Sequence, residues 1–580
     1  MQGDKNVIHV WDVHEVVLNA LCVYENPYMD LDVWIDLKGP GFEKRVYGFW
    51  DGGNIFKIRF TATVPGIWSY CSGASCEDAG LIGVNGEFEA ISWTEKEKEE
   101  NISRSGIPGS DKNGHGFSHP DGKSFFMLGD TWWSTPTYRF KWCEDDSEHP
   151  IEDGYFKDLA KYRKEQGYNT IAMLAAHPTW ANDGKPPQIE IEPGVWARDA
   201  WKQSGTKSAK DMHNEGGRPF LFPGHIKEFE DVVPDFTRIN PEYFQHMDKK
   251  VNYLQSQGLL SFIEVSRRDI STVWKKYGGW PLTYTRYIQY IFARYQANYC
   301  LLSPIHFDWE ACSIPSKDFN EPINLWLNKY GPPPFGTLVG TNASPSTLVN
   351  FGNEDEAPWL TFHQTGNWRE HDHHWYLTEI YRSTPAKPAI AGEPYYPGFP
   401  DGKPPVNSHD AELNNRAGLY GSILSGAIGG VIYGCEGIWG SDIETEASVK
   451  MVDSFKLRSG IESPFVQDFV LSEGDRYLEL EPENELVTPN KAGPHLGYRG
   501  WAYCAITPER DYGLFYFEKD CPEVIIRGFT PDVQYKLFYF DPVTGGWDAE
   551  CKEIKIDKAG RASIPKRPQS EDFGIKILKI

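Results

Sequence analysis

Short segments that alternate apolar and polar side chains fill the first 92 residues of the chain. The clearest lie at residues 16–18, 31–37, 58–64 and 86–90. Gly, Pro and Asn residues separate these segments, as expected for turns. Alternation places one face of a strand on a core and the other in water. The pattern therefore predicts a β-sandwich over residues 1–92.

Beyond this region, short apolar runs alternate with helix-like segments. A charged run at 95–100 comes first and predicts a solvated linker. Helical patterns such as 155–166 and 241–257 lie between apolar runs. Eight such runs are found, at 125–128, 170–174, 259–265, 300–302, 337–339, 359–362, 388–391 and 429–433. Eight strand-then-helix units predict a (β/α)₈ barrel over residues 93–459.

Strand patterns return in the last part of the chain. Residues 513–517, 523–526 and 535–540 alternate as strands do, and 541–546 reads as a turn. The predicted fold class is thus α/β. It is a (β/α)₈ TIM barrel flanked by an N-terminal β-sandwich domain and by a C-terminal one at 460–580. The stretch 181–236 is rich in Pro and Gly, and we expect it to cross the barrel mouth.

Charge and hydropathy narrow the class of partner. The chain carries 82 acidic and 58 basic residues, a net charge of −24, so we expect no nucleic-acid partner. No apolar run reaches the length of about 18 residues that a membrane helix needs, so we expect no membrane partner. The first residues lack a basic start and an apolar run. This favours a cytoplasmic location, although a trimmed secreted or periplasmic protein would look the same.

Polar and aromatic side chains follow nearly every predicted barrel strand. The carboxyl ends of barrel strands form the active site of such folds. Aromatic residues make up 14% of the chain, and flat rings stack on the apolar faces of sugars. We therefore expect a carbohydrate substrate and these substrate-binding residues: Asp130, Trp132, His177, Arg267, His306, His363, Gln364, Tyr395 and Trp439.

Two carboxylates in the same region suit glycoside hydrolysis. That reaction needs one acid to protonate the leaving oxygen and a second to attack the anomeric carbon or activate water. Glu393 follows the seventh run and supplies the second group. Asp308 or Glu310, after the fourth run, supplies the first, and both can point the same way because strand residues alternate sides. Asp308 is slightly favoured, and Glu310 remains the alternative.

Several motifs resemble one enzyme family. Phe-Met-Leu-Gly-Asp-Thr-Trp-Trp at 126–133, Gly-Tyr-Asn-Thr-Ile at 167–171, the 387–396 segment and Tyr433-Gly434 with Ile438-Trp439 look like the apiosidase-like barrel family of clan A glycosidases. The motifs at 26–28, 48–52 and 59–60 resemble a β-sandwich domain of unknown function that often precedes this barrel. The C-terminal segment resembles the collagen-binding-like β-domain that often follows it.

The resemblance implies a retaining glycoside hydrolase that cleaves a complex plant, algal or microbial oligo- or polysaccharide. It implies Glu393 as nucleophile and a strand-4 carboxylate as acid/base, with no cofactor and no metal. The fourth strand departs from the family pattern, because it runs Ser-Pro-Ile-His-Phe-Asp-Trp-Glu at 303–310. The main alternative is a non-catalytic carbohydrate- or matrix-binding protein, which has no need of both carboxylates. A polysaccharide lyase, in which Arg267 or Arg268 binds a uronate, is a weaker alternative.

Overall fold

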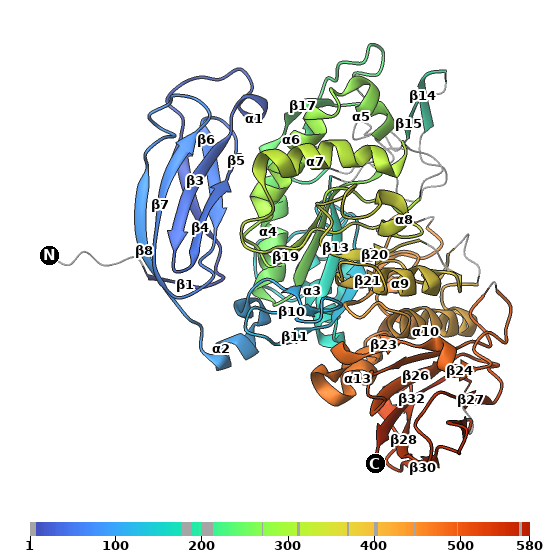
Figure 1. Cartoon of the computed structure of the whole chain (residues 1–580). Coiled ribbons are helices and arrows are strands. Elements are labelled where there is room, and N and C mark those ends of the chain that lie inside the picture. The colour runs from blue at the N-terminus through green and yellow to red at the C-terminus, as the bar shows by residue number, and fades with distance from the viewer. Residues whose placement is uncertain are drawn as a thin grey trace.

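The computed structural model of the 580-residue chain shows three parts, with the strands of a central sheet between two β-rich ends (Figure 1). The structure describes residues 7–176, 188–193, 195–198, 213–231, 233–268, 271–309, 314–367, 370–399, 404–445, 447–495, 497–567 and 571–580. Two candidate residues, His177 and Glu310, lie outside these ranges. So does part of the segment expected to cross the barrel mouth.

The N-terminal part consists of two sheets packed on one apolar cluster. In chain order its strands are β1 (Val7–His9), β2 (His14–Asn19), β3 (Val33–Gly39), β4 (Phe42–Tyr47), β5 (Phe49–Trp50), β6 (Ile55–Phe60), β7 (Gly66–Ala74) and β8 (Asn85–Ile91). The five-stranded sheet has the order β1-β8-β7-β3-β4, and the three-stranded sheet has the order β2-β6-β5. The inward residues Ile35, Ile58 and Trp68 are fully buried between the sheets, as the alternation predicted.

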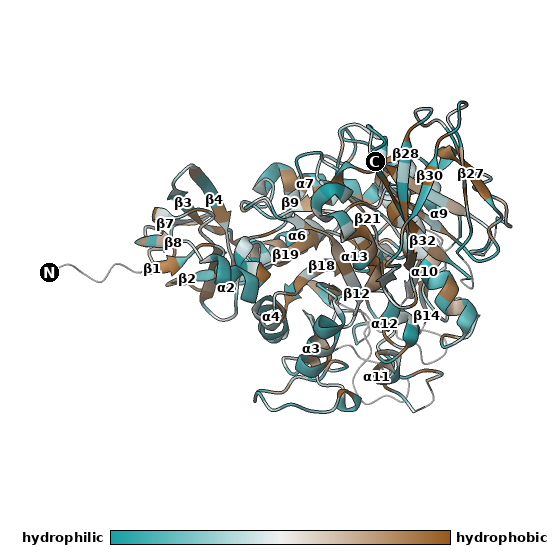
Figure 2. Cartoon of the chain, turned by 90° about the horizontal axis from the view of Figure 1, so that it is seen from below, coloured by the Kyte–Doolittle hydropathy of each residue, from teal (hydrophilic) through white to brown (hydrophobic). Residues whose placement is uncertain are grey.

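The charged run at 95–100 is a helix rather than a linker. Helix α2 (Glu95–Glu100) begins with a capping box, in which the side chains of Thr94 and Glu97 each bond the backbone N–H of the other. No side chain of this helix is buried, and Figure 2 shows it as hydrophilic. The charge pattern indicated the exposure correctly, but the cap makes the segment helical.

Parallel strands form the centre of the molecule. They are β12 (Met127–Thr131), β13 (Thr170–Ala176), β18 (Leu260–Ser266), β19 (Cys300–Ser303), β20 (His363–Thr365), β21 (Ala389–Ala391) and β22 (Gly430–Tyr433). Their order is β19-β18-β13-β12-β22-β21-β20, and every neighbouring pair is parallel. This curled seven-stranded sheet gives the chain a mixed α/β fold, with all the strand carboxyl ends at one edge.

Two of the eight predicted runs behave differently from the rest. Residues 337–339 form only an isolated parallel bridge, between Leu302 and Val339. The run at 359–362 does not form a strand. The N–H groups of Thr361 and Phe362 both donate to the Val339 carbonyl, and the strand begins at His363. The 337–343 segment thus lies between β19 and β20.

Helices follow most of the central strands. The α-helices in the described part of the chain are α1 (Pro27–Asp30), α2, α3 (Phe156–Gln166), α4 (Pro241–Ser256), α5 (Ser271–Tyr277), α6 (Leu282–Tyr295), α7 (Asn320–Tyr330), α8 (Thr347–Phe351), α9 (His373–Tyr381), α10 (His409–Leu424), α11 (Met451–Ser454), α12 (Arg458–Glu462) and α13 (Phe465–Val470). Within the described ranges, no helix has the length and apolar character needed to span a membrane.

The smaller strands complete the middle of the chain. The run at 125–128 is divided between β11 (Ser124–Phe125) and β12, and β11 pairs with β10 (Phe117–Ser118), which pairs with β9 (Gly109–Ser110). Two hairpin-like pairs lie within 181–239. They are β14 (Gln188–Glu192) with β15 (Val195–Arg198), and β16 (Phe220–Leu221) with β17 (Asp235–Ile239).

The C-terminal part has two further sheets. The seven-stranded sheet contains β23 (Glu481–Pro482), β25 (Ala502–Ile506), β26 (Tyr512–Phe517), β32 (Phe573–Lys579), β28 (Gln534–Asp541), β29 (Gly546–Trp547) and β30 (Lys552–Lys555). The three-stranded sheet contains β24 (Val487–Thr488), β27 (Val524–Ile526) and β31 (Ala562–Ile564). Residues 541–545 form the predicted turn, through Asp541 carbonyl bonds to Thr544 and Gly545.

A buried ionic triad joins the N-terminal sheets to the central part. Arg59 on β6 and Arg294 on α6 both donate to the carboxylate of Asp248 on α4, at distances from 2.6 to 3.0 Å. Burial of Asp248 opposes its charge, but the two arginines hold the pKa of this carboxyl well below its ordinary value. The charged triad is therefore a fixed part of the contact between the two parts.

We expect Asp248→Asn to destabilise the protein by about 3–5 kcal/mol, because it removes the anion that the two buried guanidinium groups share and leaves Arg59 with Glu15 and Arg294 with Asp51. Thermal or urea unfolding at pH 7 measures this loss. Asp36→Asn is the control, since the Asp36–Arg45 pair is 48% and 45% exposed and contributes at most about 1 kcal/mol. Because the Asp248 pKa is lowered in the folded state, the loss shrinks as pH falls below about 4. Equal unfolding midpoints for both variants would contradict the role of the triad.

Candidate active site

The carboxyl ends of β18, β19 and β21 bring an ionisable cluster together. Glu264 lies in β18, His306 and Asp308 follow β19, and Glu393 follows β21. The backbone continues the strand pairing here, because His306 N–H donates to the Ser266 carbonyl at 2.8 Å. All four residues are at most 8% exposed. The predicted residues His306, Asp308 and Glu393 thus lie in one buried group.

Glu264 and His306 form the innermost pair of the cluster. A carboxylate oxygen of Glu264 bonds Nδ1 of His306, and the other accepts the backbone N–H of Asn342 at 3.3 Å. Burial alone would lower the pKa of His306, but the charges of Glu264 and Asp308 outweigh it and raise the pKa to about 10. His306 is therefore an imidazolium at neutral pH.

Asp308 is held by two arginines. Arg268 donates to one of its carboxylate oxygens, and Arg267 Nη2 lies 3.4 Å from the other. His306 Nε2 lies 3.6 Å from Asp308. Burial opposes its charge, but Arg268, Arg267 and His306 hold the pKa of Asp308 well below its usual range. Asp308 is thus an ionised carboxylate in this arrangement.

Glu393 shares the space in front of His306. Its Oε1 lies 4.0 Å from His306 Nε2. One ligand-type atom from each of His306, Asp308 and Glu393 lies within 4.8 Å of the other two. The positive charge of His306 favours an ionised carboxylate at Glu393. The cluster thus presents two close carboxylates with a cation between them.

The same three side chains are of types that bind metal ions. A metal-bound histidine must give up its proton, and a site rich in carboxylates favours a cation. Here Glu264 holds a proton on His306, and Arg267 and Arg268 already neutralise Asp308. These positive charges disfavour the binding of a metal ion at the cluster.

Of two further predicted residues, Gln364 lies beside the cluster, next to Gly392, and Trp439 lies after the last central strand. Gln364 on β20 is fully buried, and a Cβ added at Gly392 would come within 2.8 Å of its Oε1. Neither the oxygen nor the nitrogen of the Gln364 amide has a hydrogen-bond partner within the described ranges. Trp439, after β22, packs on the apolar cluster that fills the inside of the sheet. Both placements agree with a position next to a bound ligand.

A cavity of about 940 Å³ opens between the loops that follow β21 and β22. The Glu436 N–H donates to the Pro397 carbonyl at 2.9 Å and joins these two loops. The volume is within the range of ordinary small-ligand pockets. Its lining includes an aromatic wall and both signs of charge, namely Phe399, Asn407, Glu436, Trp439, Lys450 and Asp453.

Four predicted residues make contacts in other parts of the structure. Asp130 is fully buried and accepts from Arg163 Nε at 2.7 Å and from Trp132 Nε1 at 2.8 Å. Trp132 is fully buried and stacks on Phe140. These contacts place Asp130 and Trp132 in the structural core, and their contact with a sugar stays a prediction.

His363 and Tyr395 also lie elsewhere. His363 begins β20 instead of ending it, and its Nδ1 bonds Thr347 Oγ1 at 2.8 Å. Burial, helped by Lys387, lowers the pKa of His363 to about 3, so it is neutral. The Tyr395 ring faces Tyr498 of the C-terminal part, with ring centroids 5.8 Å apart. The remaining prediction, His177, lies outside the described residues.

Three aromatic residues that are adjacent in the sequence to predicted site residues were not predicted themselves. The Trp133 ring lies 4.5 Å from that of His306. The Tyr396 hydroxyl bonds Thr131 at 2.6 Å, and its ring lies over Gly434, where a Cβ would clash at 2.5 Å. Trp309, directly after Asp308, is 53% exposed. Alternation of side chains along a strand was the signal that could have identified these residues. An error of one residue in the predicted end of a strand, however, reverses which residues face the site.

Comparison with protein families adds to this geometry. Residues 111–468 match the family described as apiosidase-like, catalytic domain. Residues 7–75 match a domain of unknown function (DUF5060). No curated protein matches the sequence.

Comparison with solved structures gives relatives in fold. A candidate glycoside hydrolase from Bacteroides vulgatus has a TM-score of 0.67 at 16% identity, over 99% of this chain and 100% of that one. A glycoside hydrolase family 5 protein from the same organism has a TM-score of 0.56 at 16% identity, over 82% and 94%. A third structure, named glycoside hydrolase, has a TM-score of 0.54 at 15% identity, over 82% and 97%. At such identities the likeness shows the fold alone.

The Glu264–His306 pair predicts a specific pH dependence. The pKa of His306 is raised from 6.5 to about 10 in the folded state. Its stabilising contribution is therefore complete below about pH 6.5 and is lost as pH rises through about 10. We expect Glu264→Gln to lower the free energy of unfolding by about 3–5 kcal/mol at pH 6.5, and by less at pH 10.5.

Thermal unfolding of both proteins at the two pH values measures this difference. Glu148→Gln is the control, because Glu148 is 82% exposed and pairs with Lys161 at the surface. A difference between wild type and Glu264→Gln that stays the same from pH 6.5 to 10.5 would show that His306 is not protonated by this pair.

Proposed function

The chain belongs to the apiosidase-like catalytic-domain family, and we propose that it is a retaining glycoside hydrolase acting on a complex oligo- or polysaccharide. One observation carries the proposal. Carboxylate oxygens of Asp308 and Glu393, from strand ends far apart in sequence, lie within 4.8 Å of each other. Retaining glycosidases hold their two carboxyl groups about 5–5.5 Å apart, whereas inverting ones need about 6.5–9.5 Å.

We also propose that the central sheet closes into a complete (β/α)₈ barrel. The 337–343 segment supports this, because it makes backbone hydrogen bonds on both sides. Gly340 N–H donates to Leu302 on one side, and Thr361 N–H donates to Val339 on the other. The domain boundaries at 92/93 and 459/460 remain predictions.

Glu393 is the proposed nucleophile. Attack on the anomeric carbon needs an ionised carboxylate. The imidazolium of His306 lies 4.0 Å away and favours that form. Glu264 fixes His306 through Nδ1 and keeps its proton in place. Gln364, next to Gly392, is the proposed donor and acceptor for a sugar hydroxyl.

The acid/base is a strand-4 carboxylate, Asp308 or Glu310. Asp308 lies near Glu393, but Arg267 and Arg268 hold it ionised. A general acid must carry a proton, which such sites achieve by raising the pKa. Asp308 can therefore act only if the bound substrate weakens its contact with an arginine. Otherwise Glu310 supplies the proton.

The ionised state of Asp308 also favours a second candidate function. A protein that binds glycans without cleaving them needs no proton donor, and a carboxylate held by two arginines is a rigid hydroxyl acceptor. In that case the cluster orients a bound sugar, and the wild-type protein releases no sugar from a glycan.

We expect Glu393→Gln to lower kcat by about a thousandfold or more, because the amide cannot form the glycosyl-enzyme bond. A panel of aryl glycosides, including an apioside because of the family name, and of plant and algal oligosaccharides measures the activity. Glu152→Gln is the control, since this side chain is exposed and pairs with Lys456. A 2-fluoro-glycoside should label Glu393 covalently, as read by peptide mass. Activity that survives in Glu393→Gln would remove it as nucleophile.

Leaving-group dependence distinguishes Asp308 from Glu310. The variant that lacks the acid should lose most activity on substrates with poor leaving groups but little on a dinitrophenyl glycoside, which needs no protonation. Azide should restore activity in that variant and form a glycosyl azide of retained configuration. We expect this behaviour in only one of Asp308→Asn and Glu310→Gln. If neither shows it and the parent releases no sugar, the binding function is favoured.

A further inference from the structure

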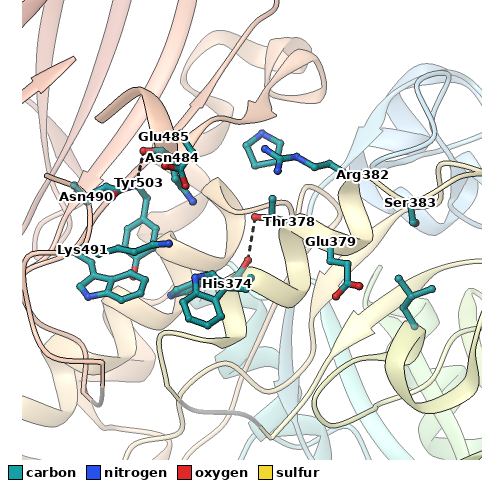
Figure 3. Close-up of a pocket in the computed structure, with 15 residues that line it drawn as sticks. His374, Thr378, Glu379, Arg382, Ser383, Asn484, Glu485, Asn490, Lys491 and Tyr503 are labelled. Atoms are coloured by element: carbon teal, nitrogen blue, oxygen red, sulfur yellow. Dashed lines mark hydrogen bonds between the residues drawn. The ribbon is translucent and has the colours of Figure 1, made fainter. Parts of the chain in front are cut away.

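A second cavity lies between helix α9 and the C-terminal part (Figure 3). Its volume is about 660 Å³, within the range of about 300–1,000 Å³ of small-ligand pockets. None of its lining residues belongs to the carboxylate cluster or to the cavity beside Trp439. Its walls come from α9, from 482–491 and from the start of β25.

Its walls are fixed before any ligand binds. Asn484 donates to Ser425 Oγ at 3.2 Å and accepts the Cys504 N–H at 2.7 Å. Asn490 donates to the Asn484 carbonyl at 2.8 Å. On the opposite wall, Thr378 Oγ1 bonds the Ser425 carbonyl at 2.9 Å. A preformed cavity of this kind loses little conformational entropy on binding.

Aromatic rings line one end of the cavity. Trp375 is 47% exposed, which is unusual for so large an apolar side chain. The Lys491 ammonium lies 5.1 Å from the Trp375 ring and 5.5 Å from the Trp501 ring. The Trp501 ring is stacked on the His371 ring, with the ring centroids 3.9 Å apart. Trp375 thus offers an indole surface to a flat apolar partner.

Unsatisfied polar groups lie behind this surface. His374 is 2% exposed, and neither ring nitrogen has a hydrogen-bond partner within the described part of the chain. The buried Trp501 Nε1 lacks one in the same way. Burial, together with His373 and His371, holds the pKa of His374 well below its ordinary value. His374 is therefore a neutral ring with one donor and one acceptor.

The charges around the cavity balance. Two acidic side chains, Glu379 and Glu485, and two basic ones, Arg382 and Lys491, line it, and all four are exposed. Figure 3 shows them spread around the walls from both α9 and the C-terminal part. A balanced set of donors and acceptors beside an indole suits hydroxyl groups on an apolar ring better than an ion.

From this lining we infer that the cavity binds a short segment of a neutral glycan, apart from the site proposed to cleave it. The sugar face would lie on Trp375, and its hydroxyls would reach the polar groups on the walls. The ligand class follows from the lining itself and does not depend on catalysis by Glu393. In a glycosidase such a site would hold a polymer at the surface while the strand-end cluster acts on another part of it.

Affinity electrophoresis of the full chain tests the inference. All proteins carry Glu393→Gln so that no polymer is cut, and the gels contain galactomannan, xyloglucan or the acidic polygalacturonate. We expect at least one neutral polysaccharide to retard the parent. Trp375→Ala should raise the apparent Kd about tenfold. Ile525→Ala is the matched control, because Ile525 is 46% exposed and lies on β27 outside the cavity.

Lys491→Ala separates neutral from acidic ligands. Removing the ammonium uncovers the indole rings, so binding of a neutral glycan should persist or tighten. Retardation only by polygalacturonate, lost in Lys491→Ala, would overturn the inference. So would equal retardation of Trp375→Ala and the parent, or no retardation by any neutral polysaccharide. Loss of retardation by a neutral polysaccharide in Trp375→Ala would support the binding site even if the wild-type protein cleaved no glycan.

Discussion

The candidate site depends on charge balance at the ends of three parallel strands. Parallel pairing places Glu264, Asp308 and Glu393 close together and out of water. Three carboxylates in so small a volume repel one another strongly. The structure compensates with three cations, His306, Arg267 and Arg268, each in contact with at least one of them. Even with these cations, burial raises the pKa of the Glu264 carboxyl.

The same balance sets the chemistry that each group can perform. His306 is bound on one side by Glu264 and faces Asp308 and Glu393 on the other, so its charge is shared between the two candidate catalytic carboxylates. Asp308 also contacts two arginines, Arg267 and Arg268. Dividing acid and nucleophile roles between two carboxylates requires different environments. The contacts with the two arginines suit Asp308 as an ionised carboxylate better than as a proton donor.

The outer parts of the chain extend this central arrangement. The buried Arg59–Asp248–Arg294 triad fixes the N-terminal sheets against α4 and α6, so this contact is rigid and polar. The C-terminal sheet packs instead on α10 and borders α9, where His371 bonds Glu518 at 3.0 Å. Between α9 and that sheet the packing leaves the cavity beside Trp375. The C-terminal part thus both supports the central sheet and creates a surface of its own.

Most of the central strands and the residues that follow them were predicted from the sequence alone, because apolar runs mark buried strands and parallel pairing brings their carboxyl ends together. Those two facts were enough to select His306, Asp308, Gln364 and Glu393. Side-chain direction was decided only by tertiary structure. His363 is the first residue of its strand, because the N–H groups of Thr361 and Phe362 before it donate to the Val339 carbonyl. Trp133, rather than Trp132, contacts the site, because its ring lies 4.5 Å from that of His306. Neighbouring residues on a strand face opposite ways, so contacts between distant segments, which no local pattern encodes, choose between them.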